Sequence, residues 1–222
     1  MDDDRFIDRG IPTGADGKPV EAFEDIVFGD PDINESTLEA HVLRALLQHR
    51  FSEALKGNLS LSYGDYDKYY ANFYASAYDE AATPDQVTLD GYVDTTDRQN
   101  FILSGNLIGE FTTGEVEHTV IFGVEYLDTA SDQDRFNPDF DPGAGTQDTM
   151  MFIISDRSVD GVGFNAGGLD AGPFTDLNDA TQSNLEVYSL YFQDEIQLFE
   201  TLQLVLGGRF DSFQIDVSGT SA

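Results

Sequence analysis

The sequence predicts an all-β protein, an antiparallel up-and-down meander of about six long strands. Apolar and polar residues alternate with a period of two over runs of about ten residues. These runs come in pairs joined by short turns, and long polar segments separate the pairs. A transmembrane β-barrel has short turns at one end and long loops at the other. The pattern therefore favours strands of such a barrel, and a soluble β-sandwich is the alternative.

The last hairpin has the clearest alternation. Two runs of about ten residues meet at Glu200 and Thr201, and so short a turn predicts a long β-hairpin. The apolar side consists of Tyr188, Leu190, Phe192, Ile196 and Leu198, followed after the turn by Leu202, Leu204, Leu206 and Phe210. Because the period is two and not 3.6, an amphipathic helix is the weaker interpretation.

Two further hairpins precede it. The first runs over residues 37–51, turns at 52–57 and returns through 58–78. The second begins near residue 98, turns at 112–115 and returns through 116–128. In its first strand the apolar side holds Phe101, Leu103, Leu107 and Phe111, and the polar side holds Asn100, Ser104, Asn106 and Glu110.

Segments 1–36, 77–97 and 129–183 are predicted to be long loops. Structureless loops of more than about 15 residues are uncommon in compact soluble domains, whereas outer-membrane barrels carry them at one end. Phe51, Phe111 and Phe199 lie at the short turns, where a barrel places an interfacial girdle of aromatic residues. The alternative is that aromatic residues simply favour strands.

Composition excludes several classes of protein. Lys and Arg total 11 against 42 Asp and Glu, a net charge of −31, which argues against nucleic-acid partners and anionic membrane surfaces. Ten Tyr and 17 Phe argue against disorder, and the absence of Cys excludes disulfides and thiol chemistry. The first residues do not resemble a signal peptide, and no apolar run is long enough for a transmembrane helix. A targeting segment is therefore expected outside this chain.

Charged residues on the strands fall on the polar side of the alternation. A charge facing lipid near the bilayer midplane would cost about 2–4 kcal/mol, so these residues are expected to face the barrel lumen. The charged residues predicted to face the lumen are Arg44, Arg50, Glu125, Arg209 and Asp211. Ordinary lumen lining and ion pairs between strands are the alternative to a functional role.

The sequence contains no convincing catalytic or cofactor motif. Gly-x-Ser-x-Gly, His-Glu-x-x-His and P-loop patterns are absent, so no enzymatic activity, catalytic residue or cofactor is predicted. The three His residues are scattered along strands, and no metal site is predicted from them. Asp132, Asp134, Asp139 and Asp141 could form a loose calcium site, although they lack the glycine and bidentate Glu of an EF-hand loop. A solvated acidic loop is the alternative.

Two motifs resemble the barrel of TonB-dependent siderophore receptors. The first is the Tyr-x-Gln-Asp strand followed by a Gly-Gly-Arg-aromatic-Asp strand, which matches Tyr191, Gln193, Asp194, Gly207, Gly208, Arg209, Phe210 and Asp211. The second is the Thr-Gly-x-x-x-His-x-x-x-x-Gly-x-(Asp/Glu)-Tyr hairpin, which matches Thr113, Gly114, His118, Gly123, Glu125 and Tyr126. The resemblance covers nearly the whole chain except the segments 79–95 and 129–183.

The resemblance implies a fold and a function. Residues 1–222 are expected to be part of a 22-stranded transmembrane β-barrel in the outer membrane of a Gram-negative bacterium, with the plug domain and remaining strands outside this chain. The implied function is TonB-energised uptake of ferric siderophores, with outer-membrane lipid around the barrel and the TonB complex contacting the plug. A cobalamin or carbohydrate importer and a soluble β-sandwich binding module are the alternatives.

A tyrosine-rich strand end is the candidate ligand contact. Residues 66–78 place many aromatic rings with polar tips before a long segment, which suits an amphipathic iron chelate at the mouth of a barrel. Tyr66, Tyr70 and Tyr74 continue the polar side of Ser60 and Ser62 and are predicted to face inward if no bulge intervenes. A second aromatic girdle is the alternative.

Overall fold

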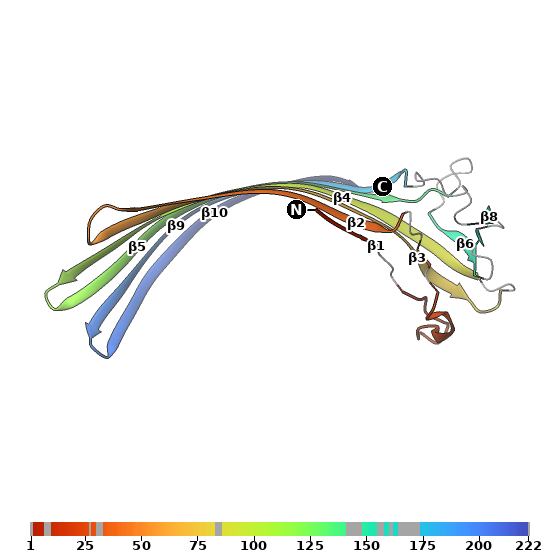
Figure 1. The fold of residues 1–222 in the computed structure, drawn as a ribbon, viewed down its shortest axis with the longest axis horizontal. Helices are drawn as coiled ribbons and strands as arrows, with labels where there is room; N and C mark the ends of the chain where they lie inside the picture. The colour runs from red at the N-terminus through yellow and green to blue at the C-terminus, as the bar shows by residue number, and fades with distance from the viewer. Residues whose placement is uncertain are drawn as a thin grey trace.

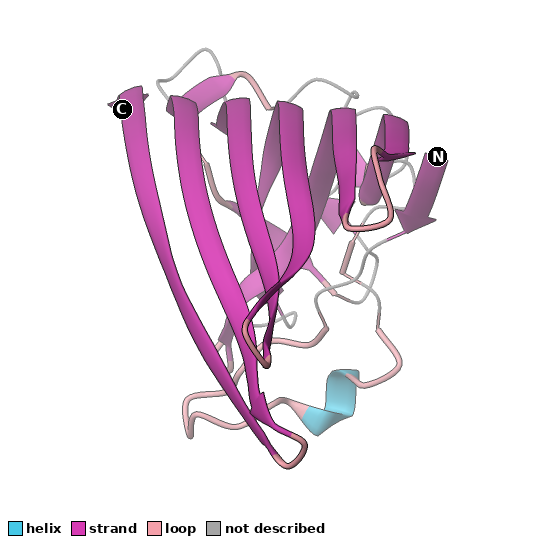
Figure 2. Ribbon diagram, turned by 90° about the vertical axis from the view of Figure 1, so that its left-hand side faces the viewer, coloured by secondary structure: helices cyan, strands magenta, loops and turns pink. Residues whose placement is uncertain are grey.

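The chain forms one continuous antiparallel sheet. The computed structural model describes residues 2–6, 10–26, 28–29, 33–82, 86–140, 148–154, 158–159, 162–163 and 174–221. The six long strands, in chain order, are β2 (Glu35–Arg50), β3 (Leu55–Asp79), β4 (Gln86–Thr113), β5 (Val116–Asn137), β9 (Asp176–Phe199) and β10 (Leu202–Ser221). Each long strand pairs with the next one in this order (Figures 1 and 2). This confirms the predicted all-β meander.

The short elements gather at one end of the sheet. The turns β2–β3, β4–β5 and β9–β10 lie together at the opposite end (Figure 1). Strand β1 (Asp2–Phe6) pairs with the start of β2, and β6 (Met150–Ile153) pairs with the start of β4. Strands β7 (Ser158–Val159) and β8 (Val162–Gly163) continue from β6, and η1 (Glu21–Phe23) is a short 3-10 helix. No helix in the described part of the chain is long and apolar enough to cross a membrane.

The strands are longer than the sequence predicts. Most of segment 77–97 is strand, because β4 begins at Gln86, and segment 129–183 loses residues at both ends to β5 and β9. Residues 87–93 alternate Val87, Leu89 and Val93, all buried, with polar residues that are half-buried. The period of two thus continues into the segment predicted to be a loop. The many polar residues of this stretch make the alternation hard to recognise in the sequence.

The register of the strands divides the sheet into two faces. Residues directly paired across antiparallel strands point to the same side, and successive residues alternate. One row consists of Leu47, Leu59, Gly105, Val124, Leu190 and Phe210. The next row consists of Gln48, Asn58, Asn106, Gly123, Tyr191 and Arg209. We call these sides the apolar face and the polar face.

Aromatic side chains border the apolar face at both ends. Phe51, Phe111 and Phe199 lie at the turn end and are 58%, 53% and 69% exposed, as a girdle requires. A second row, which the sequence analysis missed, crosses the strands at Tyr63, Phe101, Tyr126 and Tyr188. Beyond this row the same face becomes acidic, with Asp65, Asp67 and Asp97 on paired positions of β3 and β4.

His118 and Asp194 form an exception on the apolar face. His118 pairs with Ile196 and Asp194 pairs with Val120, so the two polar side chains are diagonal neighbours among apolar ones. His118 Nδ1 lies 3.0 Å from Asp194 Oδ2, and the ring of Phe111 stacks on His118 with centroids 4.9 Å apart. Both side chains are largely covered, at 16% and 17% exposed. The pair satisfies two polar groups that would otherwise face an apolar environment.

A small hydrophobic core covers the loop end of the apolar face. Phe73 of β3 and Val87 and Leu89 of β4 are fully buried, and Phe23 and Phe28 pack against them. The register of β3 shifts between Ala75 and Ala77. This bulge moves Tyr78 to the apolar face, opposite Val87, where its ring meets Phe23 edge-on at 5.0 Å.

Asn34 attaches the segment before β2 to the middle of β3. Its Oδ1 accepts the backbone N–H of Phe73, and its Nδ2 donates to the carbonyl of the same residue, both at 2.9 Å. The Asn34 side chain therefore extends the backbone pairing of β2 by one step. A Cβ on Gly29 would overlap the Asn34 amide, so this position has room only for glycine.

We expect Asn34→Ala to loosen the tyrosine-rich part of β3. The substitution leaves a buried N–H and a buried carbonyl of Phe73 without these partners, at about 1–3 kcal/mol for each group. Hydrogen exchange measured by mass spectrometry should rise over residues 71–75. Ser36→Ala, two positions along the chain, is the matched control, and unchanged exchange in Asn34→Ala would contradict the role assigned to this side chain.

Because the apolar face is exposed, we expect the isolated chain to need detergent or lipid to stay in solution. Leu107 is 46% exposed and Phe122 43% exposed, on the central strands of a continuous apolar surface. We expect the isolated chain to be monodisperse in detergent micelles and to self-associate in buffer alone, as followed by size-exclusion chromatography with light scattering. A monomeric peak without detergent, together with a cooperative thermal transition, would contradict this expectation.

Candidate functional site

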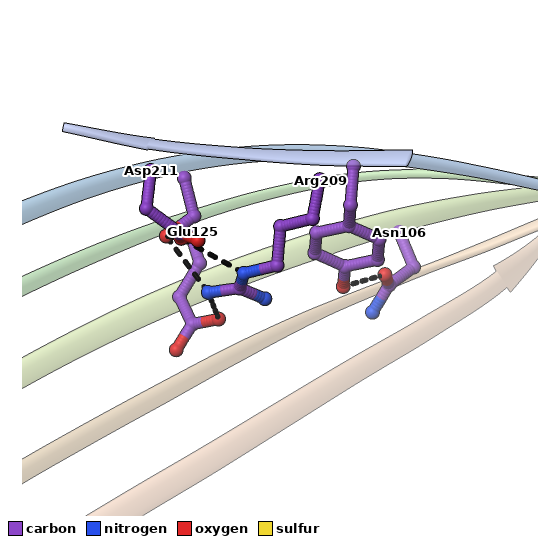
Figure 3. A network of polar contacts seen from close by, with 6 residues as sticks. Asn106, Glu125, Arg209 and Asp211 are labelled. Atoms are coloured by element: carbon purple, nitrogen blue, oxygen red, sulfur yellow. Dashed lines mark hydrogen bonds and ion pairs between the residues drawn. The ribbon is translucent and has the colours of Figure 1, made fainter. Parts of the chain in front are cut away.

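An ion-pair network on the polar face joins β5, β9 and β10. Arg209 Nε lies 2.8 Å from Asp211 Oδ1, and Arg209 Nη2 lies 3.3 Å from Glu125 Oε2 (Figure 3). Ser189, which is buried, accepts from Arg209 Nη2 at 2.8 Å and donates to Asp211 at 2.5 Å. Three of the charged residues predicted to lie on this face therefore contact one another. One guanidinium thus balances part of the charge of two carboxylates and ties neighbouring strands together.

The network continues across the sheet through Tyr191. The guanidinium of Arg209 lies 5.5 Å from the centroid of the Tyr191 ring, and the Tyr191 hydroxyl donates to Asn106 (Figure 3). Asn106 in turn donates to Asn58 at 3.0 Å. Gly123 lies directly opposite Tyr191, and a Cβ at that position would overlap the phenol ring. Gly123, the glycine of the hairpin motif, is therefore needed for the Tyr191 ring to lie flat across β5.

Arg44 and Arg50 lie on the polar face of β2. Arg44 is paired with Ser62 and Arg50 with Lys56, and all of β2 from His41 to Arg50 is exposed. The ammonium of Lys56 lies 3.7 Å from Glu110, so one of the two adjacent cations has a carboxylate partner. The register thus places Arg44 and Arg50 on the polar face. It remains a prediction that this face lines the lumen of a barrel.

The loop end of the polar face holds an aromatic cluster. Tyr70 and Tyr92 stack with centroids 5.7 Å apart, and Tyr74 meets Tyr92 edge-on at 6.3 Å. Arg135 lies over the Tyr92 ring at 4.4 Å and is held by Asp94 through two hydrogen bonds of 2.6 Å. Hydrogen bonding to Asp94 raises the pKa of the Arg135 guanidinium, which therefore stays cationic. We call Tyr70, Tyr74, Tyr92, Arg135 and Asp94 the aromatic cluster.

The three candidate tyrosines divide into two groups. The bulge at residues 75–77 follows Tyr74, so all three lie on the polar face as the alternation requires. Tyr70 and Tyr74 belong to the aromatic cluster, whereas Tyr66 lies nearer the middle of the strand, paired with Arg98. A groove of about 290 Å³ lined by Tyr66, Lys68 and Arg98 adjoins a second one of about 620 Å³ that reaches Asp94 and Arg135.

Sequence reasoning missed Tyr92 and Arg135. Both fall in segments taken as loops, and each joins the site only because β4 and β5 extend beyond the expected boundaries. The sequence signal that could have found Tyr92 is the alternation of Leu89 and Val93 with polar residues, which continues the period of two of the rest of β4.

The groups on this face are of kinds that can recognise a ligand. The face offers hydroxyl donors, aromatic rings and paired charges, which suit the binding of a large amphipathic ligand. Within the described residues no group of three or more His, Asp or Glu side chains is arranged to hold a metal ion. Asp141 of the possible calcium site lies outside the described residues. Asp132 of that site accepts from Gln182 at 2.9 Å.

Comparison with known proteins gives a consistent result. A family model described as TonB dependent receptor-like, beta-barrel, matches residues 2–222. The ferrichrome outer membrane transporter/phage receptor of Escherichia coli K12 is 29% identical over 121 residues, which cover 54% of this chain and 14% of that protein. The metal-pseudopaline receptor CntO of Pseudomonas aeruginosa PAO1 is 24% identical over 204 residues, covering 87% of this chain and 25% of that protein.

Solved structures share the fold. The siderophore receptor PiuA of Acinetobacter baumannii superposes with a TM-score of 0.70 at 21% identity, over 100% of this chain and 33% of that chain. The open form of the ferric-catecholate import receptor Fiu of E. coli K12 gives 0.71 at 15% identity, over 97% of this chain and 33% of that chain. The chain thus spans a third or less of the length of each of these proteins.

Proposed function

The chain belongs to the TonB-dependent receptors, as part of their β-barrel domain, and we propose on that basis that its parent protein imports ferric siderophores across an outer membrane. The function is binding and transport, without covalent chemistry. The observation that carries the proposal is the aromatic cluster, which lies on the polar face, at the loop end, beyond the second aromatic row. This is where a barrel presents its mouth to the outside.

The dimensions of the sheet support this placement. Strand β4 has 28 residues, and at about 3.3 Å per residue it is far longer than a hydrocarbon core of about 30 Å requires. The apolar face between the two aromatic rows has the composition of a lipid-facing band, and the acidic positions begin beyond it. The aromatic cluster would therefore stand above the lipid, in contact with water and ligand.

The energy source and part of the site would lie outside this chain. In TonB-dependent receptors the plug fills the barrel and couples it to the TonB complex, and we propose the same arrangement for the parent protein. The network around Arg209 and the exposed Arg44 and Arg50 would then face the plug or the water-filled lumen. Charged lumen lining of this kind is consistent with the cost of placing charges in lipid.

The relatives support a metal chelate as the class of ligand. The names of the matched receptors refer to ferrichrome, metal-pseudopaline and ferric catecholate. These chelates differ in charge and donor groups, so the names agree on a chelated metal and leave the individual siderophore open.

We expect impermeant maleimide to distinguish the two ends of the sheet. The chain has no Cys, so single substitutions report single sites. In intact cells Ala82→Cys, between β3 and β4, should be labelled, and Glu115→Cys, in the β4–β5 turn, should be labelled only after the outer membrane is permeabilised. Labelling of Glu115→Cys alone in intact cells would reverse the proposed orientation.

We expect the double substitution Tyr70→Ala and Tyr74→Ala to weaken ferric-siderophore binding by the parent protein. Loss of two ring contacts should raise Kd about tenfold or more, as measured with radioactive iron on purified receptor. Tyr69→Ala is the matched control, because Tyr69 lies on the same strand and points to the apolar face. Unchanged affinity in a normally assembled double variant would assign Tyr70 and Tyr74 a structural role only.

A further inference from the structure

We propose that a groove on the apolar face, near the turn end, binds one acyl chain of a phospholipid. The groove has a volume of about 290 Å³ and lies mainly over β3, β4 and β5. On these strands the side chains of Leu59, Leu107, Phe122 and Val124 line it. We call it the turn-end groove. This inference goes beyond siderophore import and takes from it only the position of the barrel in an outer membrane.

Two glycines on neighbouring strands make the turn-end groove hollow. Gly57 pairs with Leu107 in one row of the apolar face. Gly105 pairs with Leu59 in the next row towards the loop end, so the two glycines are diagonal neighbours. Each leaves out a side chain that would otherwise continue the apolar surface. A Cβ on Gly105 would meet Leu59 and Val124 at 3.5 and 3.7 Å, which is ordinary contact, so a side chain fits there and would extend into the groove.

The direction of the hollow matches that of lipid acyl chains. The row of paired residues through Arg50 borders the β2–β3 turn, whereas the same row crosses β9 at Gln193, well before this strand ends at Phe199. Because the turns lie together at one end of the sheet (Figure 1), such rows climb away from the turns on the way from β2 to β10. The step from Gly57 to Gly105 goes one strand along that climb and two residues up the strand, at about 36° to the strand. Barrel strands tilt by about 35–45° from the barrel axis, so this step runs nearly parallel to the membrane normal.

The surroundings of the turn-end groove are those of a hydrocarbon chain. Between the two aromatic rows, the described positions of β2 to β5 on the apolar face hold no Asp, Glu, Lys or Arg, in a chain with 42 acidic residues. Asn58 and Asn106 border the groove through their backbone, since their side chains bond to each other on the polar face. Phe51 lies against Gly57 at the turn side, and His49 meets the Phe51 ring edge-on at 4.6 Å. The imidazole of His49 offers an N–H to a headgroup phosphate beside this end.

The position of the groove selects the kind of lipid. Short turns of an outer-membrane barrel face the periplasm. The groove begins at the aromatic row of the turns, beside Phe51, so its occupant belongs to the inner leaflet, where the lipid is phospholipid. A second sheet packs at about 10 Å through interdigitating side chains. A flexible acyl chain fills a narrow hollow along the membrane normal more completely than such a sheet does.

The test measures lipid bound to the full-length parent protein in detergent by native mass spectrometry. The probe is palmitoyl-oleoyl phosphatidylethanolamine, titrated from low molar ratios. We expect the first lipid to bind the wild type about tenfold or more tightly than those that follow. Gly105→Leu places a side chain in the turn-end groove and should raise the Kd of the first lipid about tenfold or more. The wild-type titration needs no variant, so it tests the groove even if Gly105→Leu does not assemble.

Gly109→Leu is the matched control, because it adds the same side chain to the same face of β4 outside the lining of the groove. It should change the Kd of the first lipid by less than about threefold. A first lipid that binds the wild type no more tightly than the others would overturn the proposal, as would equal losses in the two variants or a dimer that displaces the lipid. Each of these results would leave siderophore import standing. Failure of the wild type to take up any ferric chelate in a growth-promotion assay would instead overturn the proposed function and leave the groove standing.

Discussion

The continuous backbone ladder between neighbouring strands is the constraint on which the rest of this structure depends. Six long strands pair in chain order, and their registers run almost without interruption for sixteen residues or more. In hydrocarbon no water is present to satisfy a free N–H or carbonyl, so every backbone group needs the next strand. Once the ladder is fixed, each side chain is assigned to one face by its parity. A single register therefore decides which side chains share a face.

Alternation in the sequence was sufficient to predict the meander and the faces. Leu103 and Leu107 against Ser104 and Asn106 required only a period of two, and the structure places them as expected. The extent of the strands was harder to predict, because residues 86–97 and 129–137 are rich in Asp, Thr and Gln, which also populate loops. There the face that is apolar nearer the turns carries Asp65, Asp67 and Asp97, so both sides of these strands are polar. Prediction of a strand from the alternation of apolar and polar residues needs two different faces, and there the two faces are alike.

The candidate site could be predicted only in part for the same reason. Tyr70 and Tyr74 follow from parity along one strand, which a sequence displays directly. Tyr92 and Arg135 reach them from two other strands. Tyr92 lies 22 positions after Tyr70 in the chain, and Arg135 lies 41 positions after its partner Asp94, so the cluster forms only when all three strands are in register. The His118–Asp194 contact is similar, since neither residue predicts a partner on a strand 76 positions away. Long-range register is information that a single sequence does not contain.

The bulge between Ala75 and Ala77 decides which face each side chain at the end of β3 lies on. Before it, Tyr66, Tyr70 and Tyr74 lie on the polar face, and after it Tyr78 lies on the opposite face, where its ring packs against Phe23. Loss or gain of one residue here would move the last residues of β3, Ala77–Asp79, to the opposite face without any of them being substituted. Receptors built on such strands can therefore change the inner wall of their mouths in one mutational step. The part of β3 on the turn side of the bulge would keep its register with β2 and β4.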